Sequence, residues 1–413
     1  MAFQTALSGL NAASTDLSVT GNNIANASTN GFKQSRSEFA DVYATNLQGV
    51  SATTPGSGVR VTRVAQQFGQ GNVDFTNNNL DLAINGTGFF VLANDGALEY
   101  SRAGAYNIDR EGFVVNHKSQ RLQVFPPVAV GSGTGFNTGA LSDLQISTTE
   151  APPQGTSDAI VNVNLDASET EPAVPFDPSN AGSFNHSTSL TLYDSLGTQH
   201  TGTLYFRATA TDNQWDTFLY VDGANAPVGG GQSVPLVYGT DGSLTTANAD
   251  ATGSVTYDAF PIAGADDLDL TVDFSSSTQF GSGFGVNNLV QNGFASGKLN
   301  GLDISQTGVV FARFTNGQSQ ELGQVILAKF PNEQGLSALG DTNWGETFGS
   351  GDVNFGAAGS SDFGTLQSGA LEASNVDISQ QLVNLIIAQR NFQANAQAIT
   401  TEDTVTQTII NIR

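Results

Sequence analysis

The sequence predicts a mainly β protein with terminal α-helices. The N- and C-terminal helices are expected to pair as a coiled coil, with nested antiparallel β-domains between them. The ends carry apolar residues at heptad spacing, whereas the middle holds short alternating segments separated by Gly- and Asn-rich turns. The chain has 413 residues, 47 of them Gly, and only 38% hydrophobic residues, which favours several small domains over one large core.

The N-terminal segment has the pattern of an amphipathic helix. Its apolar stripe alternates steps of four and three, with small residues at two of the positions. A helix of about 22 residues is roughly 33 Å long. It is expected to end at Gly21–Asn23, because Gly and repeated Asn compete with helical hydrogen bonds. The stripe consists of Phe3, Leu7, Leu10, Ser14, Leu17, Gly21 and Ile24.

The C-terminal segment repeats this four-three alternation and has no Gly after Gly369. Ser374 with Asp377, or Asp377 with Gln380, has the spacing of a capping box at the helix start. A helix of about 38 residues would be roughly 57 Å long. Its stripe consists of Ile378, Leu382, Leu385, Gln389, Phe392, Ala396, Ile399, Asp403, Thr406 and Ile410. A second apolar row consists of Val383, Ile386, Ile387, Val405, Ile409 and Ile412.

Each stripe needs a partner, since a single helix leaves its apolar stripe exposed. The simplest solution pairs the two ends as a coiled coil and packs the remaining apolar rows on neighbouring copies. The alternative is two ordinary helices that cap one globular core.

The middle of the chain reads as β-hairpins. Turns are predicted at Asn94–Gly96, Asp194–Gly197 and Asn316–Gly317, each between runs of strand-forming residues. "DDLDLTVDF" (266–274) alternates acidic and apolar residues, which is typical of a half-exposed strand.

If the two ends pair, the segments that follow the first helix should pack against the segments that precede the last one. This predicts nested domains, each inner one built from two separate parts of the chain. The expected division is paired terminal helices (1–30 and 370–413), a connector (31–70 and 361–369), an inner β-domain (71–145 and 285–360) and an inserted outer β-domain (146–284).

Composition excludes several classes of function. A net charge of −24 repels nucleic acid. No run reaches the length of a membrane span, and the N-terminus lacks the features of a cleaved signal peptide. The acidic outer segment favours a solvated face over a metal-binding surface. We therefore expect no nucleic-acid partner, no membrane insertion and no metal site.

The search for an active site finds no recognisable one. The chain has no Cys, and its three His (His117, His186 and His200) lie outside any metal-type spacing. There is no nucleophile motif and no phosphate-binding glycine loop before a helix. We expect no catalytic residue and no cofactor, so the chain is not expected to be an enzyme.

Both ends resemble known sequence motifs. "ALSGLNAASTDLSVTGNNIANASTNGFK" and "GALEASNVDISQQLVNLIIAQRNFQANAQAITTEDTV" resemble the N- and C-terminal motifs of the bacterial flagellar rod, hook and hook-associated axial proteins. The interior pieces "LDLAINGTGFFVL" and "SRAGAYNIDREGFVVN" are similar to the β-domain of that family. Two departures are Gln380–Gln381, where the family often carries an acid, and Phe392, where Tyr is frequent.

The resemblance implies a structural subunit of the extracellular flagellum. Length and the inserted β-domain favour the hook, a curved flexible tube that transmits torque from rod to filament. Alternatives are a distal rod or hook–filament junction subunit or, from a different class, a secreted β-rich adhesin or glycan-active protein. The implied partners are other copies of the chain, the hook cap, the distal rod, the hook-associated proteins and the flagellar export apparatus.

Two sets of residues carry these expectations. The first is expected to make subunit contacts: Phe3, Leu7, Leu10, Leu17, Ile24, Ile378, Leu382, Leu385, Ile386, Phe392 and Ile399. The second forms the connector motif of the family: Gly21, Asn22, Asn23, Ile24, Ala25, Asn26, Gly31, Phe32 and Lys33.

Overall fold

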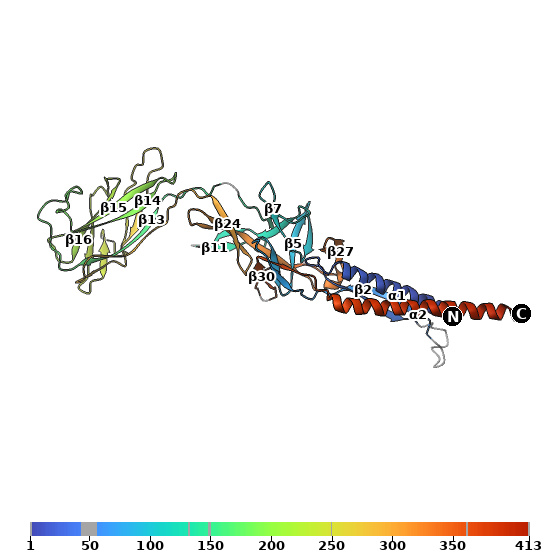
Figure 1. Ribbon diagram of the computed structural model, residues 1–413. Coiled ribbons are helices and arrows are strands. Elements are labelled where there is room, and N and C mark those ends of the chain that lie inside the picture. Colours follow the sequence, from blue (N-terminus) through green and yellow to red (C-terminus); the bar gives the residue numbers. More distant parts are fainter. Residues whose placement is uncertain are drawn as a thin grey trace. The chain divides into compact units, whose positions relative to one another are not determined.

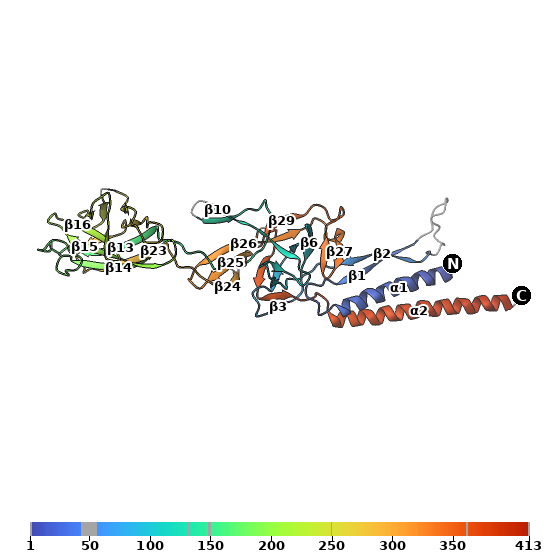
Figure 2. The same cartoon turned by 90° about the horizontal axis from the view of Figure 1, so that it is seen from above.

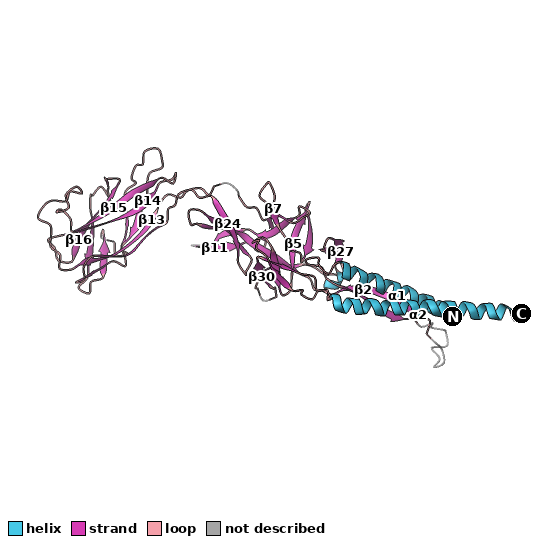
Figure 3. Ribbon diagram, viewed as in Figure 1, coloured by secondary structure: helices cyan, strands magenta, loops and turns pink. Residues whose placement is uncertain are grey.

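Two long helices and a series of short strands make up the chain in the computed structural model, which confirms the predicted fold class (Figure 1; Figure 3). The structure describes residues 2–42, 56–130, 133–147, 150–248, 250–360 and 362–411. Contacts divide the chain into two compact units. Unit 1 comprises Met1–Thr148, Gly301–Arg313 and Ser319–Arg413, and unit 2 comprises Thr149–Asn300 and Phe314–Gln318.

The helices of unit 1 are α1 (Ala2–Ala25) and α2 (Ile378–Asn411). They lie side by side and antiparallel, with the two chain ends on the same side (Figure 2). Helix α2 begins after Asp377, whose Oδ1 accepts a hydrogen bond from the backbone N–H of Gln380 at 3.1 Å. The predicted cap at Asp377 is therefore confirmed. The one at Ser374 is wrong, since its hydroxyl accepts instead from the N–H of Val376, in the turn before the helix.

Helix α1 is longer than predicted. It runs through Gly21, Asn22 and Asn23 and ends at Ala25. The backbone N–H of Asn26 still donates to the carbonyl of Asn22 at 3.1 Å. Helical hydrogen bonding continues past the Asn residues because the side chain of Asn23 bonds to another element instead of competing with its own backbone.

One large sheet forms the β part of unit 1, and it combines strands from both sides of the inserted unit 2. Its order is β24-β25-β26-β9-β5-β6-β28-β27. Phe89, Tyr100, Phe125, Phe330 and Trp344 are buried in its core. The strands are β5 (Phe89–Asn94), β6 (Ala97–Ser101), β9 (Arg121–Phe125), β24 (Leu299–Ile304), β25 (Val309–Phe314), β26 (Ser319–Lys329), β27 (Ser337–Gly340) and β28 (Asn343–Gly345).

Smaller pairings complete unit 1. Hairpin β1–β2 lies beside α1 (Figure 2). Three further pairs are β10–β11, β3–β31 and β30–β4, and the short strands β7, β8, β12 and β29 join the large sheet. Their bounds are β1 (Ser35–Asp41), β2 (Val59–Gln66), β3 (Val73–Phe75), β4 (Leu82–Asn85), β7 (Asn107–Ile108), β8 (Val114–Val115), β10 (Pro127–Val130), β11 (Gly133–Phe136), β12 (Ser142–Asp143), β29 (Asn354–Ala357), β30 (Thr365–Ser368) and β31 (Ala370–Glu372).

Unit 2 has two sheets around one apolar core that includes Val163, Leu204 and Trp215. One sheet contains β13 (Asp158–Asp166), β20 (Ser254–Thr256), β21 (Thr271–Asp273), β22 (Thr278–Phe280) and β23 (Gly285–Gln291). The other contains β14 (His186–Tyr193), β15 (Gln199–Ala208), β16 (Gln214–Val221), β17 (Ala224–Ala226), β18 (Val234–Tyr238) and β19 (Leu244–Ala247).

Two details of the β-units differ from expectation. Strand β13 pairs in parallel with β21 and β22, so unit 2 is not wholly antiparallel. The acidic stretch 266–274 contributes only Thr271–Asp273 as a strand, because the preceding residues make a single bridge from Leu268 to Phe260. The turns at Asp95–Gly96, Asp194–Gly197 and Asn316–Gly317 all connect adjacent antiparallel strands, as predicted.

Candidate functional site

The contact between α1 and α2 is built from small and polar residues. A Cβ on Gly9 would lie 2.4 Å from Oδ1 of Asn395, so a larger residue there would force the Asn395 side chain to move. Fourteen residues further along α1, the side chain of Asn23 reaches Gln381 of α2. The side chains that the helices bury are Ala12, Ala13, Thr20, Asn23, Gln381 and Ala388.

All of these residues except Ala12 lie one position before a member of the predicted apolar stripe of their helix. One position corresponds to about 100° of rotation around a helix. Leu10, Leu17, Ile24, Leu385, Phe392 and Ile399 are half-buried, whereas Phe3, Leu7, Ile378, Leu382 and Ile386 are exposed in the lone chain. The pairing of the helices is confirmed, but the expectation that their apolar stripes form the centre of the contact is wrong. Small side chains pack the helix axes closer together than leucines would.

The exposed apolar residues form what we call the outer apolar surface of the helix pair. Exposed fractions of about half are found at each of these positions near the start of α2, for example 46% at Leu382 and 49% at Ile386. The surface consists of Phe3, Leu7, Ile378, Leu382, Val383 and Ile386, together with Val405, Ile409 and Ile410 near the end of α2. Ile387 is 50% exposed but lines a groove between α1, α2 and β1.

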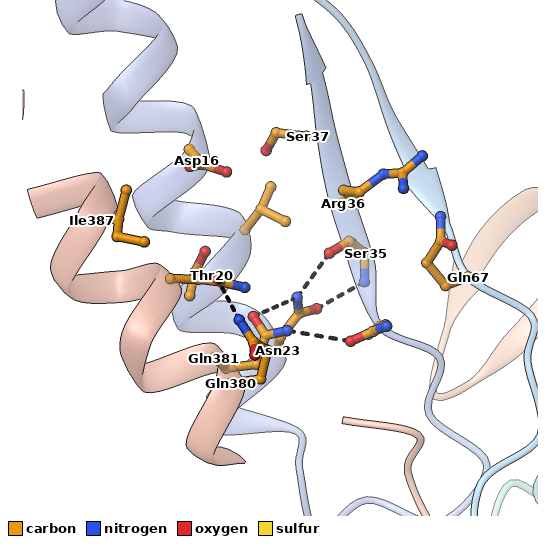
Figure 4. A pocket seen from close by; sticks show the side chains of 13 residues that line it. Asp16, Thr20, Asn23, Ser35, Arg36, Ser37, Gln67, Gln380, Gln381 and Ile387 are labelled. Atoms are coloured by element: carbon orange, nitrogen blue, oxygen red, sulfur yellow. Dashed lines mark hydrogen bonds between the residues drawn. The ribbon is translucent and has the colours of Figure 1, made fainter. Parts of the chain in front are cut away.

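Asn23 joins three elements in a groove of about 280 Å³ between α1, α2 and β1 (Figure 4). Its amide accepts from the backbone N–H of Ser35 and donates to the carbonyl of Ser35, both at 2.8 Å. The same Nδ2 lies 3.3 Å from Oε1 of Gln381. Gln381 in turn donates to the side chain of Gln34 at 3.2 Å. This network fixes where the chain leaves α1 relative to the start of α2.

Lys33 lies at the centre of a buried ion cluster. Its Nζ is 2.6 Å from Oε1 of Glu372, and neither side chain is exposed to solvent. Arg102 Nη1 lies 3.3 Å from the other carboxylate oxygen. Lys33 also donates to the carbonyl of Gly69 at 2.8 Å, and the N–H of Gly71 donates to Glu372 at 2.8 Å. Burial lowers the pKa of Lys33 and that of Arg102, and Glu372 opposes this shift for both.

The remaining connector residues serve this junction. Gly31 has φ +71°, and its N–H donates to the carbonyl of Glu372 at 2.8 Å. A Cβ there would lie 2.4 Å from the backbone N of Ala103. Asn22, Asn26 and Phe32 line a second cavity, together with Trp344. Gly21, Ile24 and Ala25 lie within the last turns of α1.

The sequence pattern left open whether Lys33 and Arg36 meet acids. Lys33 does so in the buried cluster, and Arg36 makes an exposed pair with Glu38 at 2.9 Å. The partners Glu372, Arg102 and Asn375 were not singled out from sequence. Asn375 accepts from the N–H of Gln34 and donates to Gln67 and Gly69. The local signal for Glu372 and Asn375 is polarity beside the start of the C-terminal helix, and the partners of all three residues lie hundreds of positions away.

The three histidines do not come together. His200 Nδ1 lies 2.6 Å from Asp222 and its Nε2 lies 3.5 Å from Asp194. His186 stacks on Phe284 with ring centroids 4.4 Å apart. Among the described residues, no group of three His, Cys, Asp or Glu has an arrangement that could hold a metal ion. Within the same residues, neither helix combines the length and apolar character needed to cross a membrane.

Comparison with known proteins places these features in one family. Family models match at residues 3–33 (Flagella basal body rod protein), 83–163 (Flagellar hook protein FlgE/F/G D1 domain), 164–294 (Flagellar basal body protein FlaE D2 domain) and 367–412 (Flagellar basal body rod FlgEFG protein C-terminal). Together they include α1 from residue 3 onward, the connector motif, parts of both β-units and α2.

Full-length relatives are flagellar hook proteins. The chain is 39% identical to that of Escherichia coli strain K12 and 38% identical to that of Salmonella typhimurium strain LT2, with 100% of both chains covered in each case. It is 31% identical to that of Treponema pallidum, over 98% of each chain. The crystal structure of Helicobacter pylori flagellar hook protein FlgE2 shares the fold, with a TM-score of 0.53 over 73% of this chain and 100% of that one at 13% identity. The chain therefore belongs to the flagellar hook protein family.

Proposed function

We propose that copies of this chain polymerise through the outer apolar surface of the helix pair to form the flagellar hook. The observation that carries the proposal is the exposure of this surface on two helices already paired with each other. Leu382, Ile386 and Ile409 are between 46% and 64% exposed, so the lone chain leaves much apolar area in water. Burying such area is the main favourable term in protein association.

In this proposal the two faces of the helix pair have different tasks. Gly9, Asn23 and Gln381 hold α1 and α2 together within one chain through close approach and hydrogen bonds. The apolar side chains are then directed at other chains. In this proposal Leu10, Leu17, Ile24, Leu385, Phe392 and Ile399 support the same contacts from half-buried positions at its edge.

Further parts of the proposal rest on family membership. The chain is a structural subunit of the extracellular flagellum without a catalytic role. Besides other copies of itself, its partners are the hook cap, the distal rod, the hook-associated proteins and the export apparatus. We propose the division into terminal helices (1–30 and 370–413), connector (31–70 and 361–369), inner β-domain (71–145 and 285–360) and outer β-domain (146–284). Unit 2 of the structure continues to Asn300 and so includes β23. Each of the four parts has residues outside the described ranges, most of them in the connector.

The proposal is tested by polymerisation of the purified chain at high concentration, followed by sedimentation and electron microscopy. Leu382→Asp puts a charge on the outer apolar surface, and a buried unpaired charge costs several kcal/mol, so we expect a critical concentration at least about 100-fold higher. Gln393→Asp is the matched control, because it adds the same charge to an exposed polar position of α2. Tubes formed by the Leu382→Asp chain at the wild-type concentration would refute the proposal.

A further inference from the structure

Phe348 is the most exposed large apolar side chain in the described part of unit 1. Its relative exposure is 106%, compared with 48% for Phe3 and 43% for Phe39. It therefore makes almost no contact with its own chain. A full phenyl ring in water is unfavourable, and an isolated aromatic residue that fills a pocket of a partner is a typical anchor of protein interfaces.

The turn that carries Phe348 is held firmly by hydrogen bonds. The N–H of Ser350 donates to the carbonyl of Thr347 at 3.1 Å, and the N–H of Thr347 donates to Ser350 Oγ at 3.0 Å. Ser350 is fully buried. Asn332 donates its side-chain amide to the carbonyl of Gly349 at 2.7 Å. The ring is thus presented on an ordered turn, so little conformational entropy is lost when a partner covers it.

A groove elsewhere in unit 1 is suited to receive such a ring. It has a volume of about 470 Å³ and lies between the two helices and hairpin β1–β2. Small residues line much of it, and Phe39 is half-exposed at its wall. The lining includes Gly9, Ala12, Ala13, Phe39, Val59 and Asn391.

Charge at the edge of the groove favours the same match. Glu346 and Asp352 are exposed on either side of Phe348 in the sequence. Arg60 is exposed on β2, next to the groove residue Val59, whereas the charged residue in the lining itself is Asp16. With a net charge of −24, copies of this chain repel each other unless basic residues of one copy meet acids of another.

The positions of the ring and the groove suit a filament rather than a closed dimer. The groove lies along the first part of α1, at Gly9 and Asp16. The β27–β28 hairpin, which precedes the turn of Phe348, lines a cavity with Asn22 and Asn26 at the other end of α1. Different patches on one chain give a head-to-tail contact, which continues from copy to copy.

We propose that Phe348 of one copy inserts into the groove between α1, α2 and β1–β2 of a second copy. This inference rests on the proposed polymerisation and adds a specific contact outside the outer apolar surface. Its occupant is a second copy, because both halves of the contact are present on this chain and the acids beside Phe348 are opposite in charge to Arg60 at the edge of the groove.

The absence of Cys from the sequence allows a direct test with Phe348→Cys. The rate of maleimide labelling is measured in monomer, in polymer and in denatured chain. We expect labelling in the polymer to be at least tenfold slower than in the monomer. Equal rates in monomer and polymer would overturn the inference, and would do so without affecting the proposed function, because polymerisation is scored separately.

The receptor is identified by cross-linking mixed copies. One copy carries Phe348→Cys and the other carries either Asn391→Cys, which lines the groove, or Gln393→Cys, which is exposed on α2 and does not line it. A short bifunctional thiol reagent is expected to join Phe348→Cys to Asn391→Cys and not to Gln393→Cys. Protection of Phe348→Cys without cross-linking to Asn391→Cys, or equal cross-linking to both positions, would overturn the groove as the receptor.

Discussion

Lys33 and Glu372 are separated by 339 residues in the chain, yet Nζ of the lysine lies 2.6 Å from Oε1 of the glutamate with both side chains fully buried. The pair joins the segment that follows α1 to the strand that precedes α2. The two terminal helices can pair only if the chain brings the end of α1 close to the start of α2. The Lys33–Glu372 contact holds these two points together.

Removing the charge of Glu372 should be more damaging than removing that of Lys33. Glu372→Gln leaves both Lys33 and Arg102 buried without a counterion, and breaking a buried pair in this way costs about 3–5 kcal/mol. Lys33→Met leaves Glu372 paired with Arg102, so we expect a clearly smaller loss. Denaturant unfolding of unit 1 is followed by Trp344 fluorescence in a Trp215→Phe background.

Glu38→Gln is the control for this comparison, because Glu38 makes only exposed pairs with Arg36 and Arg63. No measurable change is expected there, since exposed ion pairs contribute little. A loss from Lys33→Met that equals or exceeds the loss from Glu372→Gln would contradict this description of the cluster.

Asn23 is predicted to be needed as an amide. Asn23→Ala leaves the N–H and carbonyl of Ser35 without their partner, at a cost of about 1–3 kcal/mol in the free energy of unfolding. Asn23→Asp still accepts from the N–H but cannot donate to Ser35 or Gln381, so it too should be destabilising. The same fluorescence measurement checks both variants.

Asn22→Ala is the neighbouring control, since Asn22 is exposed while Asn23 is buried. We expect this variant to unfold like the wild type. If all three variants matched the wild type, the network around Asn23 would have no stabilising role.

His200 should make the stability of unit 2 depend on pH above neutrality. Its hydrogen bond to Asp222, and a second to Asp194, raise the pKa of His200 above its usual 6.5. A raised pKa in the folded state means that the stabilisation is fully present below about pH 6.5 and is lost as the pH rises through the folded value. Thermal unfolding followed by Trp215 fluorescence, in a Trp344→Phe background, should show a midpoint that falls between pH 6 and pH 9.

His200→Gln should remove the fall of the unfolding midpoint between pH 6 and pH 9. Other titratable groups of unit 2 affect stability in different pH ranges. Burial lowers the pKa of His186, so its effect appears below pH 6.5 and has the opposite sign. The pKa of Asp222 is lowered by its bond to His200, so its contribution is lost only in acid. A slope that persists above pH 6.5 in His200→Gln would show that another group is responsible.

Much of the fold was predictable because its signals are local. The apolar periodicity of the two ends, the cap at Asp377 and the turns at Asp95–Gly96, Asp194–Gly197 and Asn316–Gly317 each depend on residues within a few positions of one another. Alternation alone did not predict the bounds of the strand in 266–274. Thr271–Asp273 pair as a strand, whereas the residues before them make only isolated backbone contacts, such as the bridge from Leu268 to Phe260.

The contacts of the candidate site depend on distance in space rather than along the chain. The sequence by itself determined that both ends are helices, that they carry more apolar surface than one partner can cover, and that they belong with a β-rich middle. Only the tertiary structure decided which helix face turns inward. Close approach at Gly9 and the hydrogen bond between Asn23 and Gln381 favour the small, polar row, and this leaves Leu382 and Ile386 on the outside. Apolar periodicity shows that a face will be buried, but whether its own chain or another copy buries it depends on the fit of residues that lie far apart in sequence.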